Sequence, residues 1–258
     1  MRIFPLVGLG VALSGSAFAA ESPKASSLGQ SEHDWSGVYV GANVGYGRNH
    51  ADVADTFSAP GFGALGTTTH TSLSMNGAIG GGQIGYNLQR GRIVFGLEGD
   101  FQSSGQRDKH PYGCDVGGAS VPGCTVYPND QIQWFATLRA RAGITKDRWL
   151  LYGSVGPAWQ NLHSSGVVTI SGVGSWNVFS SSTTRTGYAL SSGVEGAVND
   201  RWSVGLEYLR IDTGRHETAN ISLPSGLNAA LGGPPGTAID ETHRLTDNIV
   251  RLKVNFRF

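Results

Sequence analysis

The last eleven residues, Asn248-Ile249-Val250-Arg251-Leu252-Lys253-Val254-Asn255-Phe256-Arg257-Phe258, alternate apolar and polar side chains. Every second residue from Val250 to Phe258 is apolar, and Arg251, Lys253, Asn255 and Arg257 lie between them. Because a strand points successive side chains to opposite faces, this segment predicts a strand with one apolar and one charged face. The apolar face can point into the core of a soluble sandwich, or at lipid with the charges in the lumen of a barrel.

The N-terminus has the pattern of an export signal. Met1-Arg2 is a basic start, residues 3–18 are mostly apolar and uncharged, and Ala17-Phe18-Ala19 is a small-x-small cleavage pattern. The alternative is a membrane anchor, but the run is shorter than the ~18–20 residues that a spanning helix needs, and Pro5 interrupts it. We therefore expect a signal peptide at 1–19, a flexible periplasmic lead-in at 20–34 and one β-barrel domain at 35–258.

Composition excludes one class of partner. The 258 residues include 39 glycines, only 15% are charged, and the formal net charge is zero. A nucleic-acid partner requires a basic surface, so none is expected. No phosphate-binding loop or dinucleotide fingerprint is present, and His163 beside Ser164 and Ser165 is too common a cluster to indicate catalysis. We predict no enzyme activity, no catalytic residues, no metal site and no cofactor.

Eight segments with alternating side chains are separated by connections of two lengths. The segments are 35–48, 76–89, 92–102, 131–145, 149–161, 186–199, 202–212 and the C-terminal strand. Three connections are short; four are long, at about 49–75, 103–130, 162–185 and 213–247. This asymmetry predicts an all-β fold: an eight-stranded antiparallel up-and-down transmembrane barrel with short periplasmic turns and four long external loops. The alternative, a secreted β-sandwich, would need turns of similar length at both ends.

The predicted faces place specific side chains outside and inside the barrel. In segment 131–145 we expect Ile132 and Trp134 to point outward and Gln133 inward. Aromatic residues near the predicted strand ends are typical of the girdles at membrane interfaces. These residues are Trp35, Tyr46, Trp134, Trp149, Trp202 and Tyr208.

The inward faces carry four acidic and four basic residues: Glu98, Asp100, Glu195, Glu207, Arg139, Arg141, Arg251 and Lys253. Charges inside a narrow barrel must be paired. We expect Glu98 and Asp100 to meet the two arginines of segment 131–145, and Glu195 and Glu207 to meet Arg251 and Lys253. Such a network is a structural plug or, alternatively, a charged constriction of a narrow pore. Six inward glycines would leave room for water and favour the pore: Gly41, Gly45, Gly81, Gly85, Gly96 and Gly205.

Two kinds of residue in the long connections are candidates for a further site. Cys114 and Cys124 predict a disulfide in an exported protein, whereas a metal site with His110 has a spacing that matches no standard zinc pattern. Six histidines could bind haem or a transition metal, or could simply be polar surface residues. This speculative loop ligand site comprises His50, His70, His110, His163, His216 and His243.

Several stretches together resemble a known family. They are Trp35-Ser36-Gly37-Val38-Tyr39-Val40-Gly41-Ala42-Asn43-Val44-Gly45-Tyr46-Gly47, then Gly80–Asn87, Phe95–Asp100, Trp134–Arg141 and Asp247–Phe258. They are similar to the small outer-membrane proteins of alphaproteobacteria, the Omp25/Omp31-like porin family, over essentially all of the expected mature chain. The disulfide-capable connection and the histidine-bearing connections lie outside the shared strand motifs.

The resemblance implies where the protein resides and how it is assembled. It implies an eight-stranded barrel in the outer membrane of a Gram-negative bacterium, inserted by the barrel-assembly machinery through a terminal signal of Val254, Phe256 and Phe258. Outer-membrane lipid and lipopolysaccharide are the expected partners, and the oligomeric state is left open. We expect a structural envelope role with weak small-solute porin activity. The alternative is a surface receptor that binds haem, a metal or a host ligand through its external loops.

Overall fold

The computed structural model describes residues 33–59, 63–64, 69–116, 119–222, 224–230 and 238–258. The predicted signal peptide and most of the predicted lead-in lie outside these residues. Within them, no helix is both long and apolar enough to cross a membrane.

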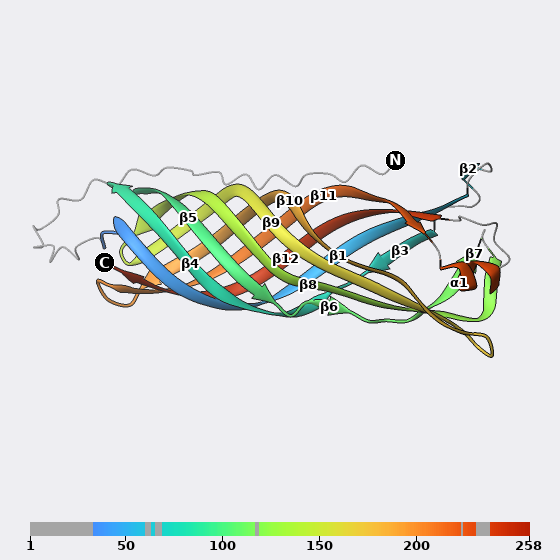
Figure 1. Ribbon diagram of the computed structural model, residues 1–258. Coiled ribbons are helices and arrows are strands. Elements are labelled where there is room, and N and C mark those ends of the chain that lie inside the picture. Colours follow the sequence, from blue (N-terminus) through green and yellow to red (C-terminus); the bar gives the residue numbers. More distant parts are fainter. Residues whose placement is uncertain (1–32, 60–62, 65–68, 117–118, 223, 231–237) are drawn as a thin grey trace, which may run out of the picture. The chain divides into compact units, whose positions relative to one another are not determined.

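Eight long strands of the described residues form a closed antiparallel ring. They are β1 (Gly37–Ala59), β4 (Asn76–Arg90), β5 (Ile93–Ser104), β8 (Ala119–Lys146), β9 (Trp149–Ile170), β10 (Gly174–Ala197), β11 (Trp202–Ser222) and β12 (Ala238–Arg257). Each strand pairs with the next, and β1 closes the ring by pairing with both β4 and β12. Figure 1 shows these strands crossing at a common tilt. The predicted eight-stranded up-and-down barrel is confirmed.

The two ends of the ring differ. One end carries the turns after β4, β8 and β10 together with the C-terminus, and we call it the short-turn end (Figure 1). Gly91 and Asp147 take positive φ angles of 58° and 55° in two of these turns. The opposite, long-connection end carries the short strands β2 (Gly63–Ala64), β3 (Thr69–Leu73), β6 (Arg107–Asp108) and β7 (Tyr112–Val116), and the helix α1 (Ser225–Ala230).

The outer face of the ring is apolar over the part of each strand nearest the short-turn end. Val44 and Tyr46 on β1 are 61% and 59% exposed, and Leu252 on β12 is 55% exposed, whereas Asn43, Arg251 and Lys253 at alternate positions point inward and are buried. The alternation predicted for β12 is therefore present, with Arg251 and Lys253 inside. A belt of exposed apolar side chains around a closed ring is the surface that lipid covers.

Most of the strands are longer than the sequence predicted. Alternation predicted segments of about 11–14 residues; β5, with 12 residues, has that length, but β8 has 28. Much of each predicted long connection continues the ladder; β9 and β10, for example, pair without interruption from Trp159 opposite Thr186 to Ile170 opposite Gly174, apart from one bulge. Beyond the lipid both faces of a strand can be polar, so the backbone pairing continues where the apolar alternation has ended.

One predicted face is wrong near the middle of β8. The register on β9 shifts between Ile132 and Trp134, which indicates a β-bulge. A bulge adds one residue and reverses the alternation beyond it. Ile132 therefore points inward with no exposed surface, and Gln133 is exposed, the opposite of the prediction.

The interior is filled in layers, which the inward positions of β12 show in order. From the short-turn end these are Asn255, Lys253, Arg251, Ile249, Asp247 and Leu245, each at most 2% exposed. Ile249 belongs to an apolar layer with Ile79, Phe135, Ala158, Ala189, Leu209 and Ile211. Leu245 belongs to a second apolar layer with Met75, Ile132 and Leu162. Charged, apolar, polar and apolar layers thus alternate along the barrel.

Candidate functional site

The structure brings all eight predicted lumen charges into one buried cluster. Glu98 and Asp100 come from β5, Arg139 and Arg141 from β8, Glu195 from β10, Glu207 from β11, and Arg251 and Lys253 from β12. The most exposed of them, Asp100, retains 6% of its surface. Four positive and four negative charges balance, as a desolvated cluster requires.

Arg139 lies at the centre of this cluster. Its Nη2 lies 2.7 Å from Glu98 Oε1 and 2.7 Å from Asp100 Oδ2, and its Nη1 lies 3.1 Å from Glu207 Oε1. Arg139 and Glu98 are direct cross-strand partners, as are Asp100 and Thr137, whose hydroxyl donates to Asp100 at 2.7 Å. The cross-strand register therefore positions these contacts.

β12 contacts the same acids from another side. Arg251 Nη2 lies 2.7 Å from Glu207 Oε1 and 3.1 Å from Asp100 Oδ2. Lys253 Nζ donates to both carboxylate oxygens of Glu98 at 2.7 Å and lies 3.3 Å from Glu207 Oε2. Each of these acids thus meets at least two cations.

Glu195 pairs differently from the prediction, which placed it with Arg251 and Lys253. Its carboxylate lies 3.2 Å from Arg141 Nη2 and accepts hydrogen bonds from Ser203 and from the Asn255 amide at 2.7 Å. By register Glu195 lies opposite Gly205, which lies opposite Lys253, but the Glu195 carboxylate contacts Arg141 on the short-turn side of the cluster. Here a hollow lined in part by His33, Trp35, Asn255 and Arg257 reaches Glu195.

Neutral side chains complete the cluster, and sequence reasoning missed them. The Tyr39 hydroxyl donates to Glu98 at 2.6 Å and accepts from Arg141 at 2.8 Å. The Tyr152 hydroxyl donates to Glu207 at 2.7 Å, and its ring lies 4.0 Å from the Arg141 guanidinium carbon. Both tyrosines occupy inward positions beside charged strands, which is the signal that could have identified them.

The inward glycines do not leave open space. A Cβ at Gly85 would overlap the Tyr39 ring, one at Gly41 would overlap the amide groups of Asn255 and Gln83, and one at Gly45 would meet Arg251. Gly81 faces Gln102, Gly96 faces Asn87 and Arg141, and a Cβ at Gly205 would lie 3.5 Å from the Glu195 side chain. The expectation that these glycines leave room for water is therefore wrong, because large lumen side chains occupy the space above them.

A second polar layer lies between the two apolar layers. Asp247 has no exposed surface, and its oxygens accept hydrogen bonds from Gln106 at 2.8 Å and from Gln160 at 3.2 Å. The three residues come from β12, the segment between β5 and β6, and β9. They therefore link opposite sides of the ring across the lumen.

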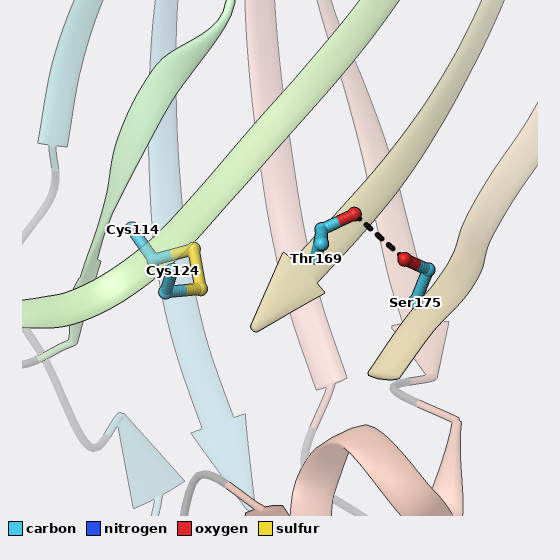
Figure 2. Close-up of a disulfide and its surroundings, with 4 residues drawn as sticks. All are labelled: Cys114, Cys124, Thr169 and Ser175. Atoms are coloured by element: carbon cyan, nitrogen blue, oxygen red, sulfur yellow. Dashed lines mark hydrogen bonds between the residues drawn. A yellow bond between two sulfur atoms is a disulfide. The ribbon is translucent and has the colours of Figure 1, made fainter. Parts of the chain in front are cut away.

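The predicted disulfide lies at the long-connection end. Cys114 on β7 is bonded to Cys124 on β8, and both are buried. They pack with Val168, Ile170 and Leu227, the last from α1. Figure 2 shows the disulfide beside the end of β9, where the Thr169 and Ser175 hydroxyls are 2.9 Å apart. The disulfide thus links β7 to β8, and its two cysteines belong to the apolar cluster at this end.

The six candidate histidines lie on six different segments of the chain. His50 lies on β1, His70 on β3, His110 beyond β6 and His163 on β9. His216 on β11 and His243 on β12 are direct cross-strand partners. Among the residues that the structure describes, no group of three or more His, Cys, Asp or Glu side chains could hold a metal ion.

Asp108 makes a strong local interaction with one of the predicted histidines, His110. Its carboxylate accepts from the His110 backbone N–H at 3.0 Å and from the Ser74 N–H at 3.1 Å, and lies 2.6 Å from His110 Nδ1. Burial by itself would raise the pKa of Asp108, but these hydrogen bonds hold the pKa below its usual value.

The predicted assembly signal lies at the outer surface of the short-turn end. Phe258 is 77% exposed, and its ring packs edge-on against Phe256 with centroids 5.3 Å apart. Val254 also points outward, at 42% exposure. These side chains take part in no lumen contact among the described residues, so the barrel does not need them for its internal packing.

Comparison with known proteins agrees with this architecture. Residues 9–258 match the family described as outer membrane protein beta-barrel domain. The chain is 31% identical over 197 residues to the 31 kDa outer-membrane immunogenic protein of Brucella melitensis, covering 72% of this chain and 75% of the relative. It is 29% identical over 194 residues to the 22 kDa outer membrane protein of Rhizobium leguminosarum bv. viciae, covering 74% and 69%.

Solved structures give more distant matches. The outer membrane protein OprG of Pseudomonas aeruginosa is 10% identical with a TM-score of 0.49, over 89% of this chain and 98% of that one. The family match, the Brucella relative and the closed ring of strands agree with the resemblance seen in the strand motifs. The chain belongs to the outer membrane protein β-barrel domain family, in its alphaproteobacterial Omp25/Omp31-like group, and resides in the outer membrane of a Gram-negative bacterium.

Proposed function

We propose that this protein is a sealed structural barrel of the outer membrane, which stabilises the envelope and presents its extended external strands, and that it does not conduct solutes. The observation that carries this proposal is the contact of Arg139 with three acids at 2.7–3.1 Å, all at most 2% exposed in their side chains. This cluster supports a structural plug over the charged constriction that the sequence also allowed.

The energetics of the cluster argue against a conducting lumen. An ion or sugar that passes Arg139 must separate it from partners that are themselves desolvated, and breaking such a buried pair costs about 3–5 kcal/mol. Here the pairs are interlinked, because Glu98 also holds Lys253 and Glu207 also holds Arg251. The apolar layer around Phe135, Leu209 and Ile249 adds a second barrier, since it offers a hydrated solute no hydrogen bonds.

Liposome swelling tests the proposal. The refolded mature protein is reconstituted beside a known porin and exposed to a small sugar such as arabinose. We expect the porin vesicles to swell and vesicles with this protein to shrink and stay small, as empty vesicles do. Swelling that depends on the amount of folded protein would contradict the proposal.

A second candidate function, a transition-metal site on the external strands, rests on one register observation. His216 and His243 are direct cross-strand partners in the register of β11 and β12, and two histidines in that relation can bind one metal ion. Two imidazoles supply half of a tetrahedral zinc shell. Calorimetry with Zn²⁺ on the intact barrel would test it. Loss of binding in His216→Ala/His243→Ala with binding kept in His163→Ala would support the site. Equal binding by the wild type and both variants would exclude it.

A further inference from the structure

A row of arginines and asparagines runs across five strands on the outer surface of the barrel. In register order it consists of Arg107 on β6, Asn76 on β4, Arg48 on β1, Asn248 on β12 and Arg210 on β11. We call it the external arginine row. The four strands β4, β1, β12 and β11 lie next to one another around one side of the ring (Figure 1).

The members of the row point away from the lumen. Arg48 precedes the fully buried Asn49, and Arg210 lies between the fully buried Leu209 and Ile211. Arg107 lies between Gln106 and Asp108, which are also buried. Since neighbouring residues of a strand face opposite ways, all three guanidinium groups are on the outer surface, where the three residues are exposed.

The row lies immediately above the apolar belt. On β1 the last outward apolar residue is Tyr46 and the next outward residue is Arg48; on β11, Tyr208 is followed by Arg210. From Val38 to Tyr46 the outward apolar stretch of β1 spans nine residues, about what a tilted strand needs to cross the hydrocarbon core. The arginines are therefore at the level of the headgroups of the external leaflet.

No acid neutralises these arginines within the described structure. Among the described residues, Arg48, Arg107 and Arg210 form no ion pair, unlike Arg139, Arg141 and Arg251 of the lumen cluster. The polar contacts of the row involve Asn248 instead. Its Oδ1 accepts a hydrogen bond from the Tyr208 hydroxyl at 2.6 Å and lies 3.5 Å from Arg210 Nη1. The amide N–H groups of Asn248 are therefore left as additional donors.

We propose that the external arginine row binds the phosphorylated headgroup of an outer-leaflet glycolipid. Successive arginines are two strand spacings apart, about 10 Å, so the row presents guanidinium forks over about 20 Å. A planar guanidinium donates two hydrogen bonds to one phosphate, and the asparagines between them donate to sugar hydroxyls. The acyl chains would lie against the apolar belt below, beside Tyr46, Val250 and Tyr208. This site is independent of the state of the lumen, and so goes beyond the proposed function.

Lipid retention by the intact mature barrel tests the site. The protein is reconstituted in phosphatidylcholine vesicles with a minor fraction of bis-phosphorylated lipid A, and bound lipid A is counted by native mass spectrometry. We expect the wild type to retain lipid A, and Arg48→Gln/Arg210→Gln to lower its apparent affinity about tenfold or more, roughly 1.4 kcal/mol or more. The matched control Arg90→Gln/Lys146→Gln removes the same charge at the short-turn end and should behave like the wild type.

The other results would overturn the assignment. If Arg48→Gln/Arg210→Gln and the wild type retain lipid A equally, the row is not the binding site. If the control variant loses as much lipid A as the double variant, binding depends on net charge and not on the row. Two results would exclude a glycolipid as the ligand. One is that the protein retains phosphatidylglycerol as well as it retains lipid A. The other is that inorganic phosphate, at the same concentration as lipid A, displaces the bound lipid A. If the double variant does not show the heat-modifiable mobility of a folded barrel, Arg107→Gln at the end of the row takes its place. We then expect a smaller loss of lipid A affinity, and an unchanged affinity would count against the site.

Discussion

The ring of Tyr39 lies directly over Gly85, its cross-strand partner on β4, so that the hydroxyl reaches both Glu98 and Arg141. A side chain at Gly85 would overlap this ring. The glycine-rich inner face therefore serves packing: Gly85 makes room for the Tyr39 ring, which completes the charge cluster, and Gly81 makes room for Gln102.

Gly85→Ala should consequently weaken the barrel. The new methyl group would push Tyr39 away from Glu98 and Arg141, at a cost of about 1–3 kcal/mol in the free energy of unfolding. Gly99→Ala is the matched control, because a Cβ there would meet its nearest atom, Leu138 Cδ1, at 3.9 Å. Urea unfolding in lipid vesicles, followed by tryptophan fluorescence, measures both. Equal stability of the two variants would show that Tyr39 can move without loss.

Removing the central cation should be far more costly than removing a surface one. Arg139→Met leaves Glu98, Asp100 and Glu207 with one cation fewer, and we expect a loss of about 3–5 kcal/mol. Arg210→Met on the outer surface should change stability by less than about 0.5 kcal/mol.

A double-mutant cycle separates the pair from its surroundings. Glu207→Gln in the Arg139→Met background restores the charge balance, so the double variant should be less destabilised than the sum of the two single variants. Strict additivity in the same unfolding assay would mean that the two groups act independently and that the cluster is not a coupled network.

Loss of the disulfide should loosen only the long-connection end. Cys114 and Cys124 lie outside the lumen charge cluster and pack with Val168, Ile170 and Leu227. Cys114→Ser/Cys124→Ser should therefore keep the heat-modifiable barrel while trypsin cleaves faster at Arg107 and Lys109, because local opening depends on local contacts. Unchanged cleavage would show that the apolar contacts hold the hairpin alone, and loss of the folded barrel would show that the bond supports the whole structure.

Acid should release the turn around Asp108 only well below neutral pH. The pKa of Asp108 is lowered in the folded protein, so its contribution to stability is present above the ordinary value of about 4 and is lost as the pH falls through the folded pKa. The amide resonances of Ser74 and His110, whose N–H groups donate to this carboxylate, should stay constant from pH 7 to about 5 and shift below it. A shift centred above pH 5 would contradict this account, because it would show that the hydrogen bonds do not keep Asp108 ionised.

The membrane-embedded part of this fold is predictable from sequence because one physical rule governs it. Where lipid contacts one face and the lumen the other, each strand must alternate, and β12 does so from Val250 to Phe258. Beyond Tyr46 on β1 that rule ends, and the strand continues to Ala59 with no pattern to reveal it. The bulge at Ile132 has no local signal either, since bulges depend on the partner strand.

The candidate site was predictable in composition and less so in pairing. All eight lumen residues can be identified because they are charged and lie at the inward positions of the alternation. The ion pair of Glu98 with Arg139 follows from the pairing of their neighbouring strands. The contact of Lys253 with Glu98 joins β12 to β5 across β1 and β4, and Glu195 meets Arg141 rather than a residue of β12. Such contacts depend on side-chain length across the lumen, which alternation alone does not determine.

Planar-bilayer conductance of the refolded mature protein, wild type beside Arg139→Ala, tests the central claim most directly. If the lumen is sealed, wild-type protein that is folded and heat-modifiable will show no channel openings. Discrete openings of the wild type, altered in size or ion selectivity by Arg139→Ala, would show that ions pass the charge cluster and would contradict the account of the lumen as a structural plug.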